Sequence, residues 1–174
     1  MAASLVSCFL VCLLSAYAAM GLLVQYGSTT VGNGNFIPLS STNSPPTVDI
    51  EGFRGNGSVR LFSVVMADQK ALPSPNAVYP YINYWIANIP AGSSGTVNGS
   101  ILEPYVAPSN TSNNIHYPNP FSAKNHTYDF VLVPQRNPLV KPMDSRIVLS
   151  LADIIRQYHC GSPLQTVSFT TSLH

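Results

Sequence analysis

A series of short β-type runs, separated by clusters of Gly, Pro, Asn and Ser, is the feature of this sequence that most restricts its fold. The three strongest runs cover residues 60–67, 81–89 and 128–133. The last of them ends in a nearly continuous apolar stretch, which is typical of a central strand buried on both faces. Weaker runs are expected over residues 21–26, 29–31, 36–39 and 47–50. Many strands punctuated by turns predict packed β-sheets.

A single helix is predicted near the C-terminus. Ser150 is suited to cap it, and Asp153 three residues later forms the carboxylate variant of a capping box. Apolar residues then recur at the spacing of one helix face, at Leu151, Ile154, Ile155 and Tyr158. Gly161 is expected to supply a left-handed stop, and Pro163 prevents continuation. The chain is therefore predicted to be mainly β, an antiparallel β-sandwich with one C-terminal helix and long loops rich in Pro and Gly.

Charged residues are scarce. The 174-residue chain has 8 basic and 7 acidic residues, or 9%, and a formal net charge of +1, whereas about 25% of a typical domain is charged. A neutral chain cannot hold a phosphate backbone through counterion release, so nucleic acid is excluded as a partner. A polybasic membrane contact is excluded for the same reason. The hydrophobic fraction of 45% is sufficient for a core and argues against disorder.

The first residues are typical of a secretory signal. Residues 4–14 form an apolar run without charge, and Ala16-Tyr17-Ala18 fits the small-x-small pattern of a cleavage site. The run is shorter than the roughly 20 apolar residues that span a bilayer, and a buried strand is the alternative. We expect a signal peptide over residues 1–18 and one domain over residues 19–174. The protein would then be secreted, without a transmembrane segment, and would keep only Cys160 of its three cysteines.

Four N-x-[ST] sequons agree with export, because glycans occur in secreted proteins and would add the solubility that surface charge does not supply. The acceptor residues are Asn56, Asn98, Asn110 and Asn125. Residues 106–125 contain two of these sequons, have no apolar periodicity and are expected to form a long loop at one end of the sandwich.

Several segments, in order, resemble the phosphatidylethanolamine-binding protein family. Residues 61–68 are similar to the strand that enters the family's D-P-D-A-P-S motif, and residues 68–75 stand in place of that motif. Further similarity is found to H-W-x-V-x-N-I-P-G over residues 84–92, to Y-x-x-P-x-P over 103–108, to H-R-Y-x-F-L-L over 126–132 and to the closing helix over 149–163. Together the resemblance covers roughly residues 22–169.

Membership would imply two stacked antiparallel sheets with a small anion pocket at one end. Known members bind phosphate-headed ligands, some inhibit kinases or serine proteases, and the family is not generally enzymatic. Carried over by position, Asp68 matches the first motif aspartate, Lys70 replaces the second, Asn83 replaces a strand histidine, Tyr105 matches a pocket tyrosine and His126 matches a later histidine.

The substitutions leave two interpretations of the pocket open. An anion site needs hydrogen-bond donors. Asn83 keeps a donor but cannot become charged, whereas Lys70 adds a positive charge that suits a phosphate or pairs with Asp68 two residues away in a loop. Each candidate also has a structural alternative: a turn-capping Asp68, a solvated Lys70 and a packing Tyr105. A glycan at Asn125 would crowd the pocket, which leaves either a surface role for His126 or an unused sequon.

The preferred hypothesis is a secreted binding protein that holds a phosphate-headed small molecule or a phospholipid headgroup at Asp68, Lys70, Asn83, Tyr105 and His126. The alternative is an extracellular interaction module or serine protease inhibitor of the same fold, with an extracellular protein as partner and the small-ligand pocket lost. No metal-ligand spacing, nucleophile elbow or phosphate-cradling glycine loop is found. We therefore expect no metal, no cofactor and no enzymatic activity.

Overall fold

The computed structural model describes residues 21–50, 52–53, 59–74, 77–93, 99–108, 125–140 and 142–172, and for residues 70–74 and 77–78 it describes the backbone alone. The expected signal peptide (1–18) lies outside the described residues, as do the sequons at Asn56, Asn98 and Asn110 and most of the expected loop over 106–125.

The described part of the chain forms two β-sheets. The smaller has the strand order β2-β1-β4 and the larger β3-β9-β8-β5-β6-β7. The strands are β1 (Leu23–Tyr26), β2 (Thr29–Thr30), β3 (Asn35–Phe36), β4 (Thr47–Asp49), β5 (Leu61–Ser74), β6 (Ala77–Pro90), β7 (Ser100–Glu103), β8 (Asn125–Gln135) and β9 (Gln165–Ser172). All pairs are antiparallel except β3 with β9. The prediction of a mainly β sandwich with one late helix is confirmed for these residues.

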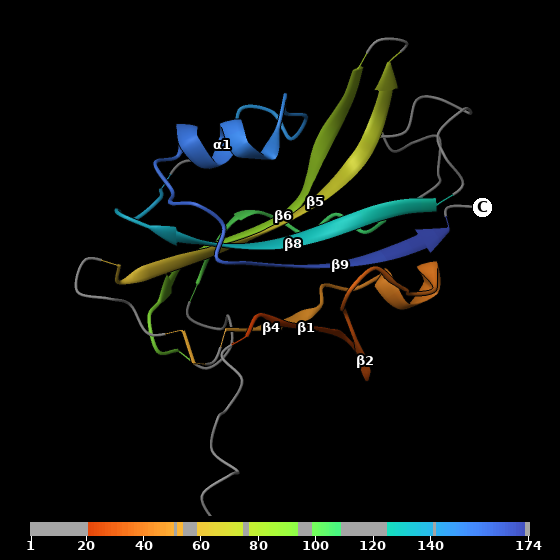
Figure 1. The fold of residues 1–174 in the computed structure, drawn as a ribbon, viewed down its shortest axis with the longest axis horizontal. Coiled ribbons are helices and arrows are strands. Elements are labelled where there is room, and N and C mark those ends of the chain that lie inside the picture. Colours follow the sequence, from red (N-terminus) through yellow and green to blue (C-terminus); the bar gives the residue numbers. More distant parts are fainter. Residues whose placement is uncertain are drawn as a thin grey trace, which may run out of the picture.

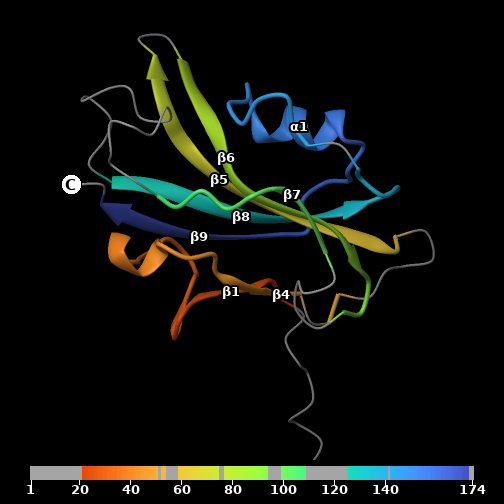
Figure 2. The same cartoon turned by 180° about the vertical axis from the view of Figure 1, so that it is seen from behind.

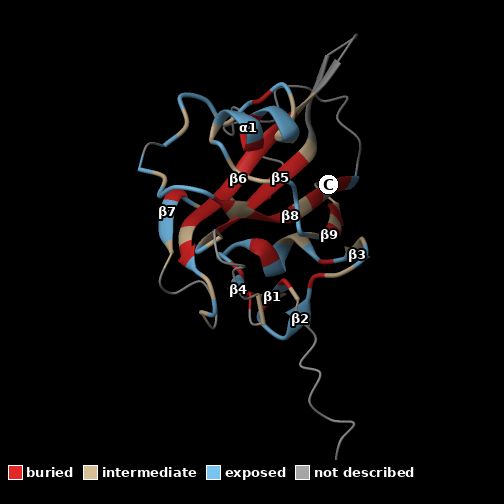
Figure 3. Ribbon diagram, turned by 60° about the vertical axis from the view of Figure 1, so that its left-hand side comes forward, coloured by how far each residue is buried: buried red, intermediate tan, exposed pale blue. Residues whose placement is uncertain are grey.

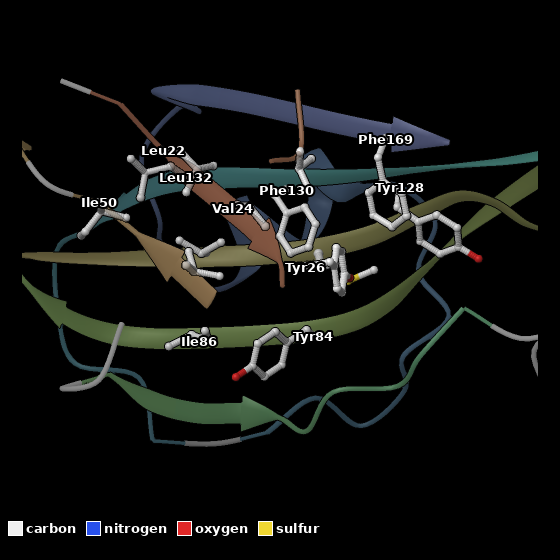
Figure 4. Packing of buried hydrophobic residues seen from close by; sticks show 14 of the residues in the cluster. Leu22, Val24, Tyr26, Ile50, Tyr84, Ile86, Tyr128, Phe130, Leu132 and Phe169 are labelled. Atoms are coloured by element: carbon white, nitrogen blue, oxygen red, sulfur yellow. The ribbon is translucent and has the colours of Figure 1, made fainter. Parts of the chain in front are cut away.

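The larger sheet is covered on both faces. The small sheet packs against one face and α1 (Leu151–Gln157) lies over the other (Figures 1 and 2). Figure 3 shows that the central strands are almost entirely buried. Between the sheets, Val24 and Tyr26 of β1 pack with Phe130 of β8 and Phe169 of β9 (Figure 4). Trp85, which belongs to the cluster beneath α1, is fully buried, as is Phe130 between the sheets.

Helix α1 begins as predicted but ends differently. The Ser150 hydroxyl accepts from the Asp153 backbone N–H at 3.0 Å and donates to the Asp153 carboxylate at 2.7 Å. The left-handed residue after the helix is His159, with φ 54°, and not Gly161. Gly161 serves another purpose: a Cβ there would lie 2.7 Å from Cγ of Pro134, so only glycine lets this turn approach β8. Among the described residues, α1 included, no helix has the length and apolarity to cross a membrane.

Three segments of the larger sheet differ from the prediction. Residues 68 and 70 lie within β5 and not in a loop, since β5 and β6 run on as a long hairpin that projects past their neighbours (Figure 1). Strand β7 was not expected because its sequence, SILE, has two adjacent apolar residues and no alternation. Strand β9 was missed because its polar residues alternate with only a few apolar ones.

Asn88 holds an irregularity in β6 by an unusual number of contacts. Its φ is 58°, and its side chain donates to the Leu139 carbonyl at 2.7 Å and accepts from the Leu139 N–H at 2.8 Å. Gln135 donates to the same Asn88 oxygen at 3.1 Å and accepts from the Asn88 backbone N–H at 2.7 Å. Asparagine suits both the left-handed backbone and the amide exchange, so this residue ties β6 to β8 and to residue 139.

Replacing Asn88 with Ala should lower the free energy of unfolding by about 3 kcal/mol, because several half-buried hydrogen bonds are lost and a Cβ-bearing residue without a polar side chain is left at positive φ. Asn88→Gly should lose about 1 kcal/mol less, since glycine tolerates that backbone. Urea unfolding followed by Trp85 fluorescence measures both. The exposed Asn137→Ala is the matched control and should change stability by less than about 0.5 kcal/mol; an equal loss there would contradict this account.

Candidate ligand-binding site

Asp68 and His126 form a buried pair at one end of the larger sheet. Asp68 of β5 is in register with Tyr128 of β8, and His126 lies two residues earlier on β8, so both side chains point to the same face. Nδ1 of His126 lies 2.7 Å from Oδ2 of Asp68, and both side chains are 0% exposed. Because an ionised carboxylate only accepts hydrogen bonds, Nδ1 carries the proton. The carboxylate therefore fixes the orientation and the tautomer of the imidazole.

A bulge in β6 brings Asn83 to the same place. Met66 pairs with Tyr84 and Ala67 pairs with Ile82, which leaves Asn83 as the extra residue. Its amide oxygen accepts from the backbone N–H of Asp68 at 3.2 Å. Its amide nitrogen donates to the carbonyl of Val106 at 2.9 Å. Asn83 thus fixes the backbone of Asp68 and joins it to the segment that follows β7.

An arginine that the sequence did not single out supports this bulge. Arg146 donates to the carbonyls of Ile82 at 3.2 Å, Asn83 at 3.3 Å and Pro104 at 2.9 Å. Its guanidinium also pairs with the Glu103 carboxylate at 3.1 Å. A planar guanidinium with five donors is suited to such convergent acceptors. Nothing in the sequence around Arg146 indicates this role, since its partners are carbonyl groups from distant strands.

The hydroxyl of Tyr105 forms its hydrogen bonds with residues other than Asp68 and His126. The hydroxyl donates to the Thr42 carbonyl at 2.6 Å and lies 3.1 Å from the Tyr26 hydroxyl. Burial raises the pKa of Tyr105 to about 12 and that of Tyr26 well above its usual range. The ring also packs edge-on against Tyr84 at 5.6 Å. Tyr105 therefore belongs to a phenol cluster between the sheets, and its neighbour Val106 provides the direct link to Asn83.

A second polar side chain faces the pair from β9. Thr171 is in register with His126, so the two side chains share a face. Its hydroxyl is buried and makes no hydrogen bond to the described part of the chain. A buried hydroxyl without a partner costs about 1–3 kcal/mol, which makes this oxygen a candidate ligand contact. Thr171 was not among the predicted site residues, because it lies in β9, the strand that was not predicted.

Lys70 and Asn125, two further predicted residues, both lie in strands of the larger sheet. The backbone of Lys70 lies in β5, and its side chain lies outside the description. Asn125 is exposed at the start of β8, whereas the next residue, His126, is buried. Because adjacent strand residues face opposite sides, a glycan on Asn125 would point away from the pair. A surface role for His126 is therefore wrong, because its side chain is buried. The geometry is compatible with either a used or an unused sequon at Asn125.

The family's H-W pair corresponds to Tyr84-Trp85 when the tryptophans are matched. Tyr84, and not Asn83, then stands in the place of the strand histidine. Tyr84 is in register with Met66 and packs on Tyr105 in the core between the sheets. By this match, a phenol stands at the histidine position of the motif, and Asn83, the residue before it, is the one that contacts Asp68.

Comparisons with known proteins identify the family and the fold of this chain. The sequence profile described as phosphatidylethanolamine-binding protein matches residues 27–164. The chain belongs to that family. The match includes Asp68, Asn83, Tyr105 and His126, so the four positions carried over by resemblance lie inside it together with Lys70.

Its similarity to individual members is low. It is 27% identical over 92 residues to Protein MOTHER of FT and TFL1 homolog 2 of rice, a match that takes in 52% of this chain and about half (49%) of that relative. A carboxypeptidase Y inhibitor solved in complex with its cognate proteinase shares 18% identity, with a TM-score of 0.66 over 88% of this chain and 83% of that one. A phosphatidylethanolamine-binding protein from Plasmodium vivax shares 16% identity, with a TM-score of 0.65 over 88% and 85%. These structures establish the fold.

The Asp68–His126 pair should show strong energetic coupling. Asp68→Ala and His126→Ala should each lower the free energy of unfolding by about 3 kcal/mol or more, because each leaves a buried polar partner behind. The double variant should cost about 1–3 kcal/mol less than the sum of the two losses. Denaturant unfolding of all four proteins gives the coupling energy.

The exposed pair Arg156–Asp153, with a 3.3 Å contact on α1, is the matched control. Solvent screening should hold its coupling below about 0.5 kcal/mol. Additive losses for Asp68 and His126 would show that the two side chains do not depend on each other.

Proposed function

We propose that this protein binds a phosphate-headed small molecule or a phospholipid headgroup beside Asp68, Asn83 and His126. The observation that carries the proposal is the convergence of these three side chains from β5, β6 and β8, which lie up to 58 positions apart in the sequence. Apolar side chains of similar volume would often stabilise a core as well as a buried ionic pair or better, because burying two charges costs much of what their attraction returns. The presence of the pair therefore favours a role other than stability.

The donors at this place suit an anion. Asp68 accepts the hydrogen bond from Nδ1–H of His126, so a protonated ring presents its second N–H, at Nε2, to a ligand. The buried hydroxyl of Thr171 on the neighbouring strand is a further donor. Asp68 and the imidazolium together carry no net charge, so the site recognises a phosphate through directed hydrogen bonds. Both side chains of the pair are enclosed, so binding a ligand there requires a rearrangement of the atoms that cover them.

Secretion is part of the proposal. The apolar run over residues 4–14, the cleavage pattern at Ala16-Tyr17-Ala18 and four sequons support it. The exposed position of Asn125 adds that at least this acceptor is on the surface of the folded domain. We propose a binding protein rather than an enzyme, because no nucleophile and base are paired at the site in the described residues.

The second candidate is inhibition of an extracellular protease. It is favoured by the shared fold with the carboxypeptidase Y inhibitor. A protease inhibitor would act through an exposed surface, so its potency would not depend on His126. Assaying serine peptidases, carboxypeptidases included, with the wild-type protein and with the His126 variant below separates the two functions.

Calorimetric titration tests ligand binding on protein secreted from a eukaryotic host. Phosphoethanolamine and inorganic phosphate should both bind, and His126→Asn should weaken binding at least tenfold, because the amide cannot become charged. His159→Asn is the matched control, since His159 is exposed and asparagine tolerates its positive φ; it should bind like the wild type. A folded wild-type sample that gives no heat at millimolar ligand would rule out the proposal.

A further inference from the structure

A groove lies on the opposite face of the larger sheet, between α1 and strands β8 and β9. It has a volume of about 440 Å³, within the usual range of about 300–1,000 Å³ for small-molecule sites. Its apolar wall includes Val131 of β8 with Leu151 and Ile155 of α1, and Thr166 of β9 borders it. Asp129 is the acidic residue of the groove lining. The groove is thus an apolar channel with one carboxylate on its sheet side.

The charges in the groove leave an excess of one negative charge. Arg156 lines it as well, but its guanidinium lies 3.3 Å from the Asp153 carboxylate and both are largely exposed, so their charges offset each other at the outer rim. Burial raises the pKa of Cys160 to about 11, so this lining thiol is neutral at physiological pH. Asp129 is therefore the charged group on the inner side of the groove, and the one positive charge of the lining, on Arg156, is already paired with Asp153.

Asp129 is prepared to receive a donor. Gln69 of β5 donates to its Oδ2 at 2.8 Å, which holds the carboxylate in place but brings no charge. Burial raises the pKa of Asp129, and the Gln69 hydrogen bond opposes that shift. A half-buried carboxylate of this kind gains from a cation placed beside it, because the cation supplies the interaction that water no longer provides.

We propose that the groove beside α1 binds a small apolar amine, with the ammonium group on Asp129 and the hydrocarbon part on Val131, Leu151 and Ile155. The ammonium would donate to the carboxylate and to the nearby hydroxyl of Thr166, and the apolar wall would remove the hydrocarbon part from water. Apolar walls with a single charged group that fixes orientation are the usual composition of a ligand site.

This groove is separate from the site at Asp68 and His126. Successive residues of β8 face opposite sides of the sheet, so His126 and Tyr128 point toward the small sheet whereas Asp129 and Val131 point toward α1. Figures 1 and 2 show α1 and the small sheet on opposite sides of β8. The two sites can therefore be tested independently on the same folded protein.

Three probes of equal size test the proposal: 2-phenylethylamine, the neutral 2-phenylethanol and the anionic phenylacetate. Backbone amide shifts are followed by NMR during titration of the full secreted protein near neutral pH. The amine should bind roughly tenfold more tightly than the alcohol, as a charge-assisted hydrogen bond to a half-buried carboxylate implies, and phenylacetate should bind least. The shifts should centre on Val131, Ile155 and Thr166.

Asp129→Asn should bring the amine to the affinity of the alcohol, because the side chain keeps its shape and loses its charge. Asp49→Asn, an equal change of charge on β4 of the small sheet, should leave the amine preference intact. Ala152→Leu, at an exposed helix position that lines the groove, should weaken all three probes and keep α1 folded. Equal affinities of the three probes, unchanged preference in Asp129→Asn, or shifts confined to the opposite face would each overturn the proposal.

Discussion

The larger sheet is covered on both faces, and this double covering governs the rest of the structure. Strands β5, β6 and β8 lie between the small sheet and α1, so their side chains are shielded whichever way they point. Polar groups there must find partners within the protein, because an unmatched buried group costs about 1–3 kcal/mol. The bonds of Asn88 to Gln135 and of Asp68 to His126 meet that requirement. The low fraction of charged residues, 9%, is consistent with this requirement, because few charged side chains then need a partner inside the protein.

The alternation of side chains along β8 divides the functional groups between two surfaces. His126 faces the phenol cluster and the small sheet, whereas Asp129 faces the groove beside α1. Asn125 lies on the same side as Asp129 but four residues earlier, about 13 Å along the strand. A glycan on Asn125 would therefore leave the buried pair undisturbed and would begin well away from the centre of the groove. The two-residue period of β8 thus places Asn125 and Asp129 on one face and His126 on the other.

The general fold was within reach of the sequence, because it depends on local patterns. The apolar runs located β5, β6 and β8, and Ser150 with Asp153 located α1, since strand and cap signals reside in adjacent residues. The left-handed residue after α1 escaped prediction because two neighbouring positions, His159 and Gly161, compete for that role. Glycine is needed at 161 for a contact with Pro134, and such a contact between distant segments is invisible in a single sequence.

Only part of the candidate site could be predicted, because some of its contacts also join distant segments of the chain. Asp68, Asn83 and His126 were chosen by resemblance, and they do lie together. The reason for Asn83 was wrong in detail, because Tyr84 precedes Trp85 and the contact arises from a bulge that shifts the register of β6 by one residue. Arg146 and Thr171 were missed, since one binds carbonyl groups and the other lies in an unpredicted polar strand. Side-chain chemistry can be read from sequence, whereas contacts made through the backbone require the register.

The pairing of Asp68 with His126 also limits how the site can recognise an anion. The His126 ring lies 2.7 Å from the Asp68 carboxylate, so the carboxylate offsets any positive charge on the ring, and the chain as a whole carries a formal charge of only +1. Neither provides the long-range positive potential that draws phosphate groups toward basic clefts. For the proposed ligand, selectivity would then come at short range, from the direction of the Nε2–H and from the hydroxyl of Thr171. Recognition of this type depends on rigid donors. Arg146 holds the β6 bulge through the carbonyls of Ile82 and Asn83, and it holds the segment after β7 through the carbonyl of Pro104.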